Sequence, residues 1–346
     1  MERLPQSCDG EAPATEQRSR RRTGPPGTSL QPPRHLQEPR IAAELKRGDF
    51  SRWQQGRGYC VQEEFIAGEP ARIFLFRISE RWHVGYKTLS DYFVYHDTPG
   101  LLCSRIYWHH VVGRLDTFRT SDTGVRVTFH PLDVTGRRAA FDAISSTTPI
   151  VHPFATHDES GLEETSPPDG WPVTEERADS LNVAEEHLRR YTRDLFGPLL
   201  SDATESITAY DPACSTGHFL ADFAGINPAR IRTVGQDLSR EMVDYAARRL
   251  DEVHVGDAFD PAPAPGTVDV LFCRFLNSEV VSTRRAREIL PRLVATVRDG
   301  GTVVLLGHSP VLLDVFDLEN AGLRVGRTTA RQDDYVFQYY VCHKAA

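Results

Sequence analysis

Residues 207–220, with the sequence ITAYDPACSTGHFL, contain the side chains best suited to hold a ligand. The apolar run 207–210 predicts a strand, Asp211 follows it directly, and a loop of small residues ending at Gly217 leads into a predicted helix. Small side chains let the backbone approach a ligand, and the N–H groups at a helix start attract a carboxylate. This layout is typical of nucleotide-like ligand sites at the carboxyl end of a parallel strand.

Two further acidic residues each follow a predicted strand, as Asp211 does. Asp237 closes the predicted strand 233–236, where a carboxylate accepts hydrogen bonds from both hydroxyls of a ribose. Asp257 closes the predicted strand 253–255, where contacts to an adenine edge are usually made. The carboxyl ends of parallel strands meet at one edge of a sheet. The sequence therefore predicts a nucleoside-containing ligand at that edge.

The elements that position these residues alternate between strand and helix after Ser206. Predicted strands cover 207–210, 233–236, 253–255, 268–272, 302–307 and 336–342, and predicted helices cover 218–224, 239–249, 283–297 and 312–321. Such alternation predicts an α/β fold with a parallel sheet covered on both faces. The last residues predict a closing antiparallel hairpin.

This order of landmarks resembles the class I S-adenosylmethionine (SAM)-dependent methyltransferases, over roughly residues 180–346, and implies a Rossmann-like sheet with SAM as cofactor. In that family the loop after strand one passes under the methionine moiety, the acid after strand two binds the ribose, and the Asp-Ala after strand three contacts adenine. The resemblance implies these cofactor-binding positions here: Asp211, Ala213, Cys214, Ser215, Gly217, Asp237, Leu238, Asp257, Ala258 and Arg274. Tyr191, on a predicted helix before the loop, either reaches the methionine carboxylate or packs in the core.

The segment after strand four faces the acceptor in this family, which places Arg274, Phe275, Asn277 and Ser278 there. We expect in-line displacement at the methyl group, accelerated mainly by alignment of the reactants. A hydroxyl or ammonium acceptor needs a base, and His308 is the candidate, although a histidine also caps strand ends structurally. Arg274 pairs either with an acceptor carboxylate or with a surface acid. The expected catalytic set is Arg274, Asn277 and His308.

The loop departs from the family, since Ser215 and Ala213 stand where glycine is usual. Either these small residues are simply tolerated, or the Ser215 hydroxyl or Cys214 thiol touches the sulfonium. The second reading keeps open an azetidine-2-carboxylate synthase type of reaction, in which SAM cyclises its own aminobutyrate arm and releases methylthioadenosine. Aromatic residues would then stabilise the sulfonium.

The sequence disfavours two other classes of protein. A DNA adenine methyltransferase is disfavoured because residues 273–277 lack the proline-containing box that holds a flipped base. A non-catalytic SAM-binding module is disfavoured because Asp237 and Asp257 are both retained.

The whole chain of 346 residues suits two modest domains. We expect a disordered tail over 1–45, rich in Pro, Gly, Ser and Arg; a β-rich domain over 46–150; a linker or lid over 151–173; and the SAM-binding domain over 174–346. Expected strands in the β-rich part cover 72–78, 82–89, 91–96, 104–112 and 125–129.

Composition limits the partners. A net charge of −8 gives no basic footprint for nucleic acid, and no apolar run is long enough to span a membrane. The six cysteines include no C-x-x-C pair, which favours a reducing, cytoplasmic compartment without a metal site. A small-molecule substrate is expected, and the sequence leaves the oligomeric state open.

Overall fold

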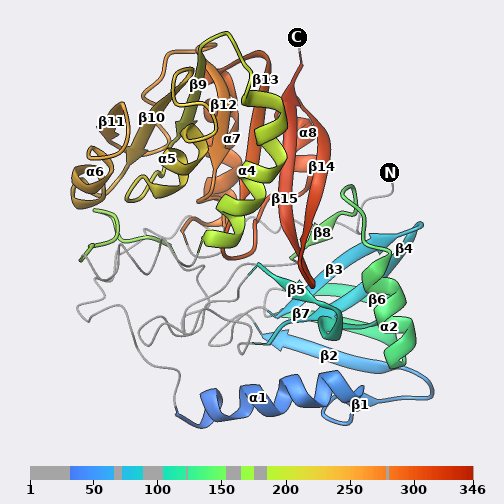
Figure 1. Cartoon of the computed structure of the whole chain (residues 1–346). Helices are drawn as coiled ribbons and strands as arrows, with labels where there is room; N and C mark the ends of the chain where they lie inside the picture. The colour runs from blue at the N-terminus through green and yellow to red at the C-terminus, as the bar shows by residue number, and fades with distance from the viewer. Residues whose placement is uncertain are drawn as a thin grey trace.

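The computed structural model describes residues 32–65, 72–88, 104–121, 124–152, 165–174, 185–277 and 280–345, and Figure 1 shows them as two sheets with their helices. The predicted strand 91–96 and Ser278 lie outside the described residues. The first sheet contains the N-terminal strands and the second contains the predicted α/β alternation.

The first sheet is entirely antiparallel, in the order β1-β2-β7-β6-β4-β3-β8. Its strands are β1 Gln54–Gln55, β2 Cys60–Phe65, β3 Ile73–Ile78, β4 Arg81–Tyr86, β6 Val111–Ser121, β7 Gly124–Pro131 and β8 Ile150–Val151. The helix α2, Val134–Asp142, follows β7 and begins at the N-cap Asp133, whose side chain accepts from the N–H of Gly136. The expectation of a β-rich arrangement here agrees with the structure.

The helix α1, Pro32–Arg47, lies beneath this sheet in Figure 1 and overlaps the predicted tail 1–45. The prediction of disorder is therefore wrong over 32–45, whereas residues 1–31 lie outside the described residues. Ile41 and Leu45 are buried against the first sheet's core, and this burial overrides the polar composition of the segment. The buried Arg137 side chain donates to the carbonyl oxygen of Leu45 and so fastens the helix end.

The second sheet has the order β11-β10-β9-β12-β13-β15-β14. Its strands are β9 Ile207–Asp211, β10 Ile231–Asp237, β11 Glu252–Val255, β12 Val268–Cys273, β13 Val297–Leu306, β14 Leu323–Gln332 and β15 Tyr335–Lys344. The first five are mutually parallel and β15 is antiparallel to both neighbours. From β9 the chain first builds the sheet outward through β10 and β11, and then returns to the other side of β9 with β12 and β13. Ligands of such sheets bind at the carboxyl ends of the two strands where the direction changes, here β9 and β12.

Helices cover both faces of this sheet, as the alternation predicts. Alternate strand residues pack against α4 Glu186–Leu200, α5 His218–Ala224 and α6 Arg240–Ala246 on one face. The other face packs against α7 Thr283–Thr296 and α8 Val315–Asn320. The α/β prediction is confirmed, although two boundaries differ. The helix α6 ends at Ala246 rather than at 249. The strand β13 begins at Val297 rather than at 302, and it passes through Gly300 at φ +72°.

The two sheets are joined at the hairpin β14–β15, whose tip reaches the first sheet in Figure 1. The short strand β5, Ile106–Tyr107, pairs with β15 through Ile106 and Val336. The Thr329 hydroxyl donates to the carbonyl oxygen of Thr148 at 2.6 Å. Hydrogen bonds therefore fasten the N-terminal half to the outer strands of the second sheet.

Candidate functional site

The loop after β9 follows a tight path that its residues explain. Ser215 has φ +52° and Gly217 has φ +81°, both in the left-handed region. A Cβ on Gly217 would lie 3.1 Å from the Cα of Ala246, so the loop packs directly on α6. Glycine therefore suits position 217 both for its positive φ and for the close packing on α6. Ser215 carries a conformational strain that glycine would not.

Asp237, at the end of β10, is held by this loop. Its Oδ2 accepts from the N–H of Ser215 at 2.8 Å and its Oδ1 accepts from the N–H of Ser239 at 2.9 Å. Burial raises the pKa of this carboxyl, while the two backbone donors oppose the rise. Each oxygen keeps a further lone pair, so the half-buried carboxylate has acceptor capacity left for ligand hydroxyls. The neighbouring Leu238 side chain is 37% exposed and offers an apolar surface beside it.

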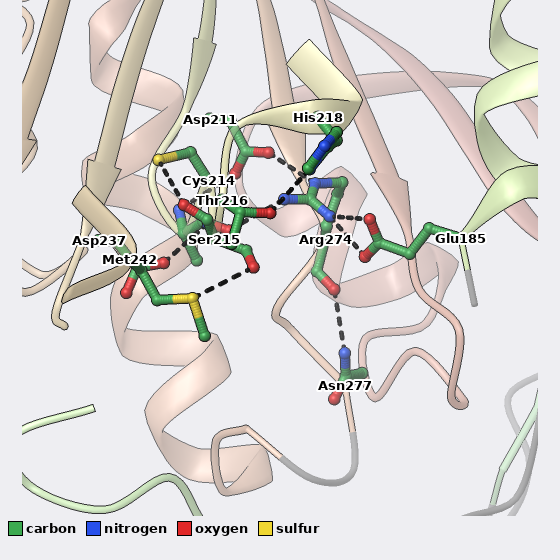
Figure 2. Close-up of polar contacts among 11 residues, drawn as sticks. Glu185, Asp211, Cys214, Ser215, Thr216, His218, Asp237, Met242, Arg274 and Asn277 are labelled. Atoms are coloured by element: carbon green, nitrogen blue, oxygen red, sulfur yellow. Dashed lines mark hydrogen bonds and ion pairs between the residues drawn. The ribbon is translucent and has the colours of Figure 1, made fainter. Parts of the chain in front are cut away.

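Asp211 belongs to a buried charge cluster, shown in Figure 2. Arg274 donates from Nε to Asp211 Oδ2 at 2.6 Å and from Nη1 to Glu185 Oε2 at 2.6 Å. Desolvation acts to lower the pKa of Arg274, but the two carboxylates outweigh it and raise the pKa. Two carboxylates around one guanidinium give the cluster a formal charge of −1, which suits a cationic group at this edge. Glu185 is not predictable from the sequence, because only the tertiary fold brings the start of α4 to the end of β12.

Arg274 also meets the loop itself. Its Nη2 donates to the carbonyl oxygen of Ala213 at 3.2 Å, and its guanidinium lies 4.9 Å from the ring centre of Phe219. The Ala213 N–H donates to Asp211 at 3.1 Å. The segment after β12 and the loop after β9 thus form one hydrogen-bonded unit, and Arg274 pairs with the buried Asp211 and the half-buried Glu185 rather than with a surface acid.

The side chains of Cys214 and Ser215 contact different parts of the structure. The Cys214 thiol is buried, burial raises its pKa well above its usual range, and a Cβ on Gly235 would lie 2.8 Å from its sulfur. The Ser215 hydroxyl instead contacts the sulfur of Met242 at 3.6 Å. The thiol is therefore protonated and packs against β10.

The third acid, Asp257, lies at the surface beyond β11. Its carboxylate pairs with Arg285 at 3.1 Å and accepts from the N–H of Phe259 at 2.8 Å, while Ala258 is buried. The buried Gln236, which the sequence analysis did not single out, fixes this loop. Its side chain donates to the carbonyl oxygen of Asp257 at 2.9 Å and accepts from the Tyr210 hydroxyl at 2.6 Å. A polar residue inside a strand was the available signal.

The remaining predicted residues divide into two groups. Asn277 is buried and donates to the carbonyl oxygen of Arg274 at 2.9 Å, which places it beside the cluster. His308 follows β13, and a Cβ on its neighbour Gly307 would lie 3.3 Å from Asn277 Nδ2. These residues therefore adjoin the site.

Tyr191 lies elsewhere. Its hydroxyl accepts from Arg327 at 2.8 Å and its ring packs on Phe337 and Tyr339, so it contacts the β14–β15 hairpin. Six residues along a helix turn through about 600°, so Tyr191 and Glu185 face different sides of α4. The structure thus supports the core-packing alternative for Tyr191.

Of the predicted linker 151–173, Val151 ends β8, and the described residues 165–173, together with Thr174, cross the carboxyl edge of the second sheet. The Ser166 N–H donates to the carbonyl oxygen of Val280 at 3.0 Å, and the Val173 N–H donates to Glu241 Oε2 at 2.9 Å. Val280 follows the acceptor-side segment and Glu241 follows Asp237. This strap (residues 165–174) therefore spans the two sides of the candidate site.

Comparison with known proteins agrees with this geometry. A family model described as a methyltransferase domain matches residues 209–301, which include the loop, Asp237, Asp257 and Arg274. Isonocardicin synthase from Nocardia uniformis subsp. tsuyamanensis is 35% identical over 300 residues, covering 82% of this chain and 95% of that protein. The chain belongs to the class I SAM-dependent methyltransferase family.

Solved structures of other proteins align with about half of the chain. A SAM-dependent methyltransferase from Aquifex aeolicus is 19% identical and covers 49% of this chain and 99% of its own, with a TM-score of 0.38. The [4+2]-cyclase SpnF is 13% identical and covers 46% of this chain and 82% of its own, with a TM-score of 0.35.

The residues present fit the family's cofactor, SAM. The Asp237 carboxylate has acceptor capacity for ribose hydroxyls, and Leu238 offers an apolar surface beside it. The anionic cluster at Asp211 suits the ammonium of the methionine moiety. Asp237, Leu238 and the cluster at Asp211 therefore make up the proposed cofactor site.

Proposed function

We propose that this SAM-dependent enzyme transfers a methyl group to a small molecule, with the cofactor held along the carboxyl edge of β9, β10 and β11. The observation that supports this most is the Asp237 carboxylate, fixed by two backbone N–H groups and backed by the left-handed loop at Ser215. Such preorganisation lowers the cost of ordering the site when the ligand binds.

The chain's own residues have distinct proposed functions. Asp237 orients the ribose, and the loop after β9 supports the methionine moiety beside the cluster of Asp211, Arg274 and Glu185. Asn277 acts as a positioning residue, since its amide holds the Arg274 backbone. His308 takes a proton from a hydroxyl or ammonium acceptor. When bound, the cofactor supplies an electrophilic carbon on its sulfonium.

An alternative displacement, at the aminobutyrate arm rather than the methyl group, retains support. The relative that covers most of the chain carries the name of a synthase, isonocardicin synthase. The small residues Ala213 and Ser215 at the methionine side also differ from the usual glycines. This reaction would release methylthioadenosine, and the nucleophile would be either the arm's own amine or a second molecule.

The test is incubation of the full chain with SAM, alone and with a panel of phenols, amines and amino acids, with products identified by mass spectrometry. S-adenosylhomocysteine that forms only with an acceptor supports methyl transfer. Methylthioadenosine identifies displacement at the arm, and its appearance with SAM alone identifies cyclisation. SAM that binds but stays intact across the panel would favour a non-catalytic module.

The setting is also proposed to be cytoplasmic. Four cysteines of the described residues, Cys60, Cys214, Cys273 and Cys342, are buried free thiols, as expected in a reducing compartment. Among the described residues, the helices include none with the length and apolar character needed to cross a membrane.

A further inference from the structure

The seam between the two sheets gathers buried polar atoms that the fold leaves unsatisfied. Among the described residues, the Ser104 and Ser309 hydroxyls and both ring nitrogens of His152 are buried without a hydrogen-bond partner. Ser104 and Ser309 are each 1% exposed and His152 is 9% exposed. Buried polar groups in folded proteins are nearly always hydrogen-bonded, so an accumulation of exceptions needs an explanation.

Ser104, His152 and Ser309 belong to three separate segments that hydrogen bonds hold at the seam. The Ser104 N–H donates to the carbonyl oxygen of His308 at 2.6 Å, which places Ser104 beside Ser309. Gln338 of β15 donates to the carbonyl oxygens of Ile150 at 3.1 Å and Val311 at 3.3 Å. His152 is two residues from Ile150, and Ser309 is two residues from Val311. One glutamine therefore holds both segments at the seam.

Two buried cations share this face of the first sheet. Lys87 is 1% exposed and its ammonium donates to the carbonyl oxygen of Arg105, next to Ser104. Arg72, the residue before β3, is 8% exposed, and its carbonyl oxygen accepts from the N–H of Lys87 at 2.9 Å. The His152 ring lies 6.0 Å from the ring of Phe74, two residues beyond Arg72 along the strand. Positive charge and hydrogen-bonding groups thus meet beside an aromatic ring.

The seam adjoins the proposed cofactor site. A Cβ on Gly307 would lie 3.3 Å from Asn277 Nδ2 and 3.5 Å from the carbonyl oxygen of Arg274. The residues that follow Gly307 are His308 and Ser309. One loop after β13 therefore has the Arg274 cluster on one side and the unsatisfied hydroxyls on the other.

We propose that His152, Ser104 and Ser309, with Lys87 as the cation, form the subsite for the carboxylate end of the small-molecule acceptor. The hydroxyls donate to the carboxylate, His152 supplies a further ring N–H, and Lys87 balances the charge. The acceptor's other end then extends past Gly307 toward the cofactor. This inference rests on the proposed function, because it gives that reaction's acceptor a chemical class.

The test uses the full chain with saturating S-adenosylhomocysteine and two probes of equal shape, phenylacetate and phenylacetamide, with binding followed by ligand-observed NMR. We expect phenylacetate to bind about tenfold more tightly than the neutral amide, because the subsite selects the charge. The variant S104A/S309A, which removes two hydroxyls with little loss of volume, is expected to abolish most of that preference. His152→Phe is expected to do the same while preserving the ring.

Matched controls separate the subsite from general effects. His130→Phe changes an exposed histidine of β7, and Lys344→Met removes an ammonium that likewise donates to a carbonyl oxygen, that of Val297. Both control variants are expected to keep the preference for phenylacetate over phenylacetamide. Lys87→Met is expected to lose it. Circular dichroism and S-adenosylhomocysteine affinity verify that each variant folds.

Equal binding of the two probes, no binding of either, or an unchanged preference in S104A/S309A would overturn the subsite. Lower stability of S104A/S309A with unchanged probe binding would instead assign the two hydroxyls to ordered water, because their removal would then break hydrogen bonds. Failure of S-adenosylhomocysteine itself to bind wild-type protein would refute the proposed function, and this result is distinguishable from the others.

Discussion

Arg274 contributes both to stability and to the proposed site through its ion pairs with Asp211 and Glu185. The Arg274 guanidinium is nearly inaccessible and is the hydrogen-bond partner of both acids. A buried ion pair contributes little net stability compared with apolar packing, but removing one partner is expensive because it leaves a buried charge uncompensated. The cluster is therefore sensitive to substitution at Arg274.

Arg274→Met is expected to lower the free energy of unfolding by about 3–5 kcal/mol, because Asp211 is left buried without its cation. Burial alone would hold the pKa of this carboxyl above its value in the unfolded chain. A raised carboxyl pKa stabilises the fold at low pH, and the stabilisation is lost as pH rises through the folded-state pKa. The deficit should therefore be smaller at pH 5 than at pH 8 in urea unfolding.

Arg298→Met is the control for this prediction, since Arg298 pairs with Asp269 while its side chain is 53% exposed. It should change stability by no more than about 1 kcal/mol. An Arg274→Met deficit that is the same at both pH values would mean that Asp211 is not the residue responsible.

Asp237→Asn tests the ribose position. The amide replaces one acceptor oxygen by a donor that opposes the N–H of Ser215 or Ser239, so the affinity for SAM should fall about ten- to a hundredfold. Isothermal titration calorimetry measures the change. Asp251→Asn, which disturbs a carboxylate bonded to Thr233 of the same strand, should leave the affinity unchanged; equal losses in both variants would refute the assignment.

Ser215→Gly relieves the left-handed strain. Glycine adopts φ +52° without penalty, so stability should rise by about 1 kcal/mol and the melting temperature by about 2–4 °C. Ser201→Gly, at a right-handed helix end, should lower the melting temperature instead. A fall for Ser215→Gly would show that the hydroxyl contact with Met242 outweighs the strain.

At the scale of elements, the strap of residues 165–174 and the loops at the carboxyl edge are interdependent. Gly170 has φ +76°, and a Cβ there would lie 2.8 Å from the backbone nitrogen of Ser239. Ser239 both caps α6 and donates to Asp237. The strap thus approaches the proposed ribose position closely, as expected of a lid.

Gly170→Ala is expected to displace the strap and speed SAM dissociation, measured by stopped-flow fluorescence. Gly266→Ala is the matched control, because Gly266 has a similar φ of +73° but no atom within 4 Å of a Cβ placed there. Both variants carry the same backbone strain, and only Gly170→Ala adds the clash. Equal dissociation rates in the two variants would contradict a lid function for the strap.

At the scale of the molecule, the two sheets are linked by polar contacts at the β14–β15 hairpin. Gln338 is 1% exposed; its amide donates to Ile150 of the first sheet and accepts from the N–H of Val311 at 3.0 Å. The other linking contacts are the strand pair β5–β15 and the threonine hydroxyls near Thr148. Stability of the halves is therefore coupled through this seam.

Gln338→Leu is expected to destabilise the protein by about 1–3 kcal/mol, because Val311 loses its Gln338 partner and the Ile150 carbonyl oxygen keeps only the Tyr340 hydroxyl as a side-chain donor. Hydrogen exchange should show faster opening at β8 than at β9, which lies away from the seam. Gln54→Leu, in the exposed short strand β1, serves as the control. Equal acceleration at β8 and β9 would contradict a local linking function.

The sequence by itself determined the second half of the fold and the positions of its acids. Strand and helix periods are local properties, so 207–210, 218–224 and 268–272 were predicted nearly as the structure has them. The places of Asp211, Asp237 and Asp257 follow, because the carboxyl ends of parallel strands share an edge. The family resemblance supplied the cofactor.

Only the tertiary structure decided which distant residues meet. Glu185 joins Arg274 across 89 positions, and Tyr191 turns to the hairpin, because helix rotation and packing decide where each side chain points. The helix α1 forms within a polar segment because the first sheet, whose strands follow it in the chain, buries its apolar residues. The contact of Ser104 with His308 likewise depends on docking two sheets, and no local pattern encodes that pairing.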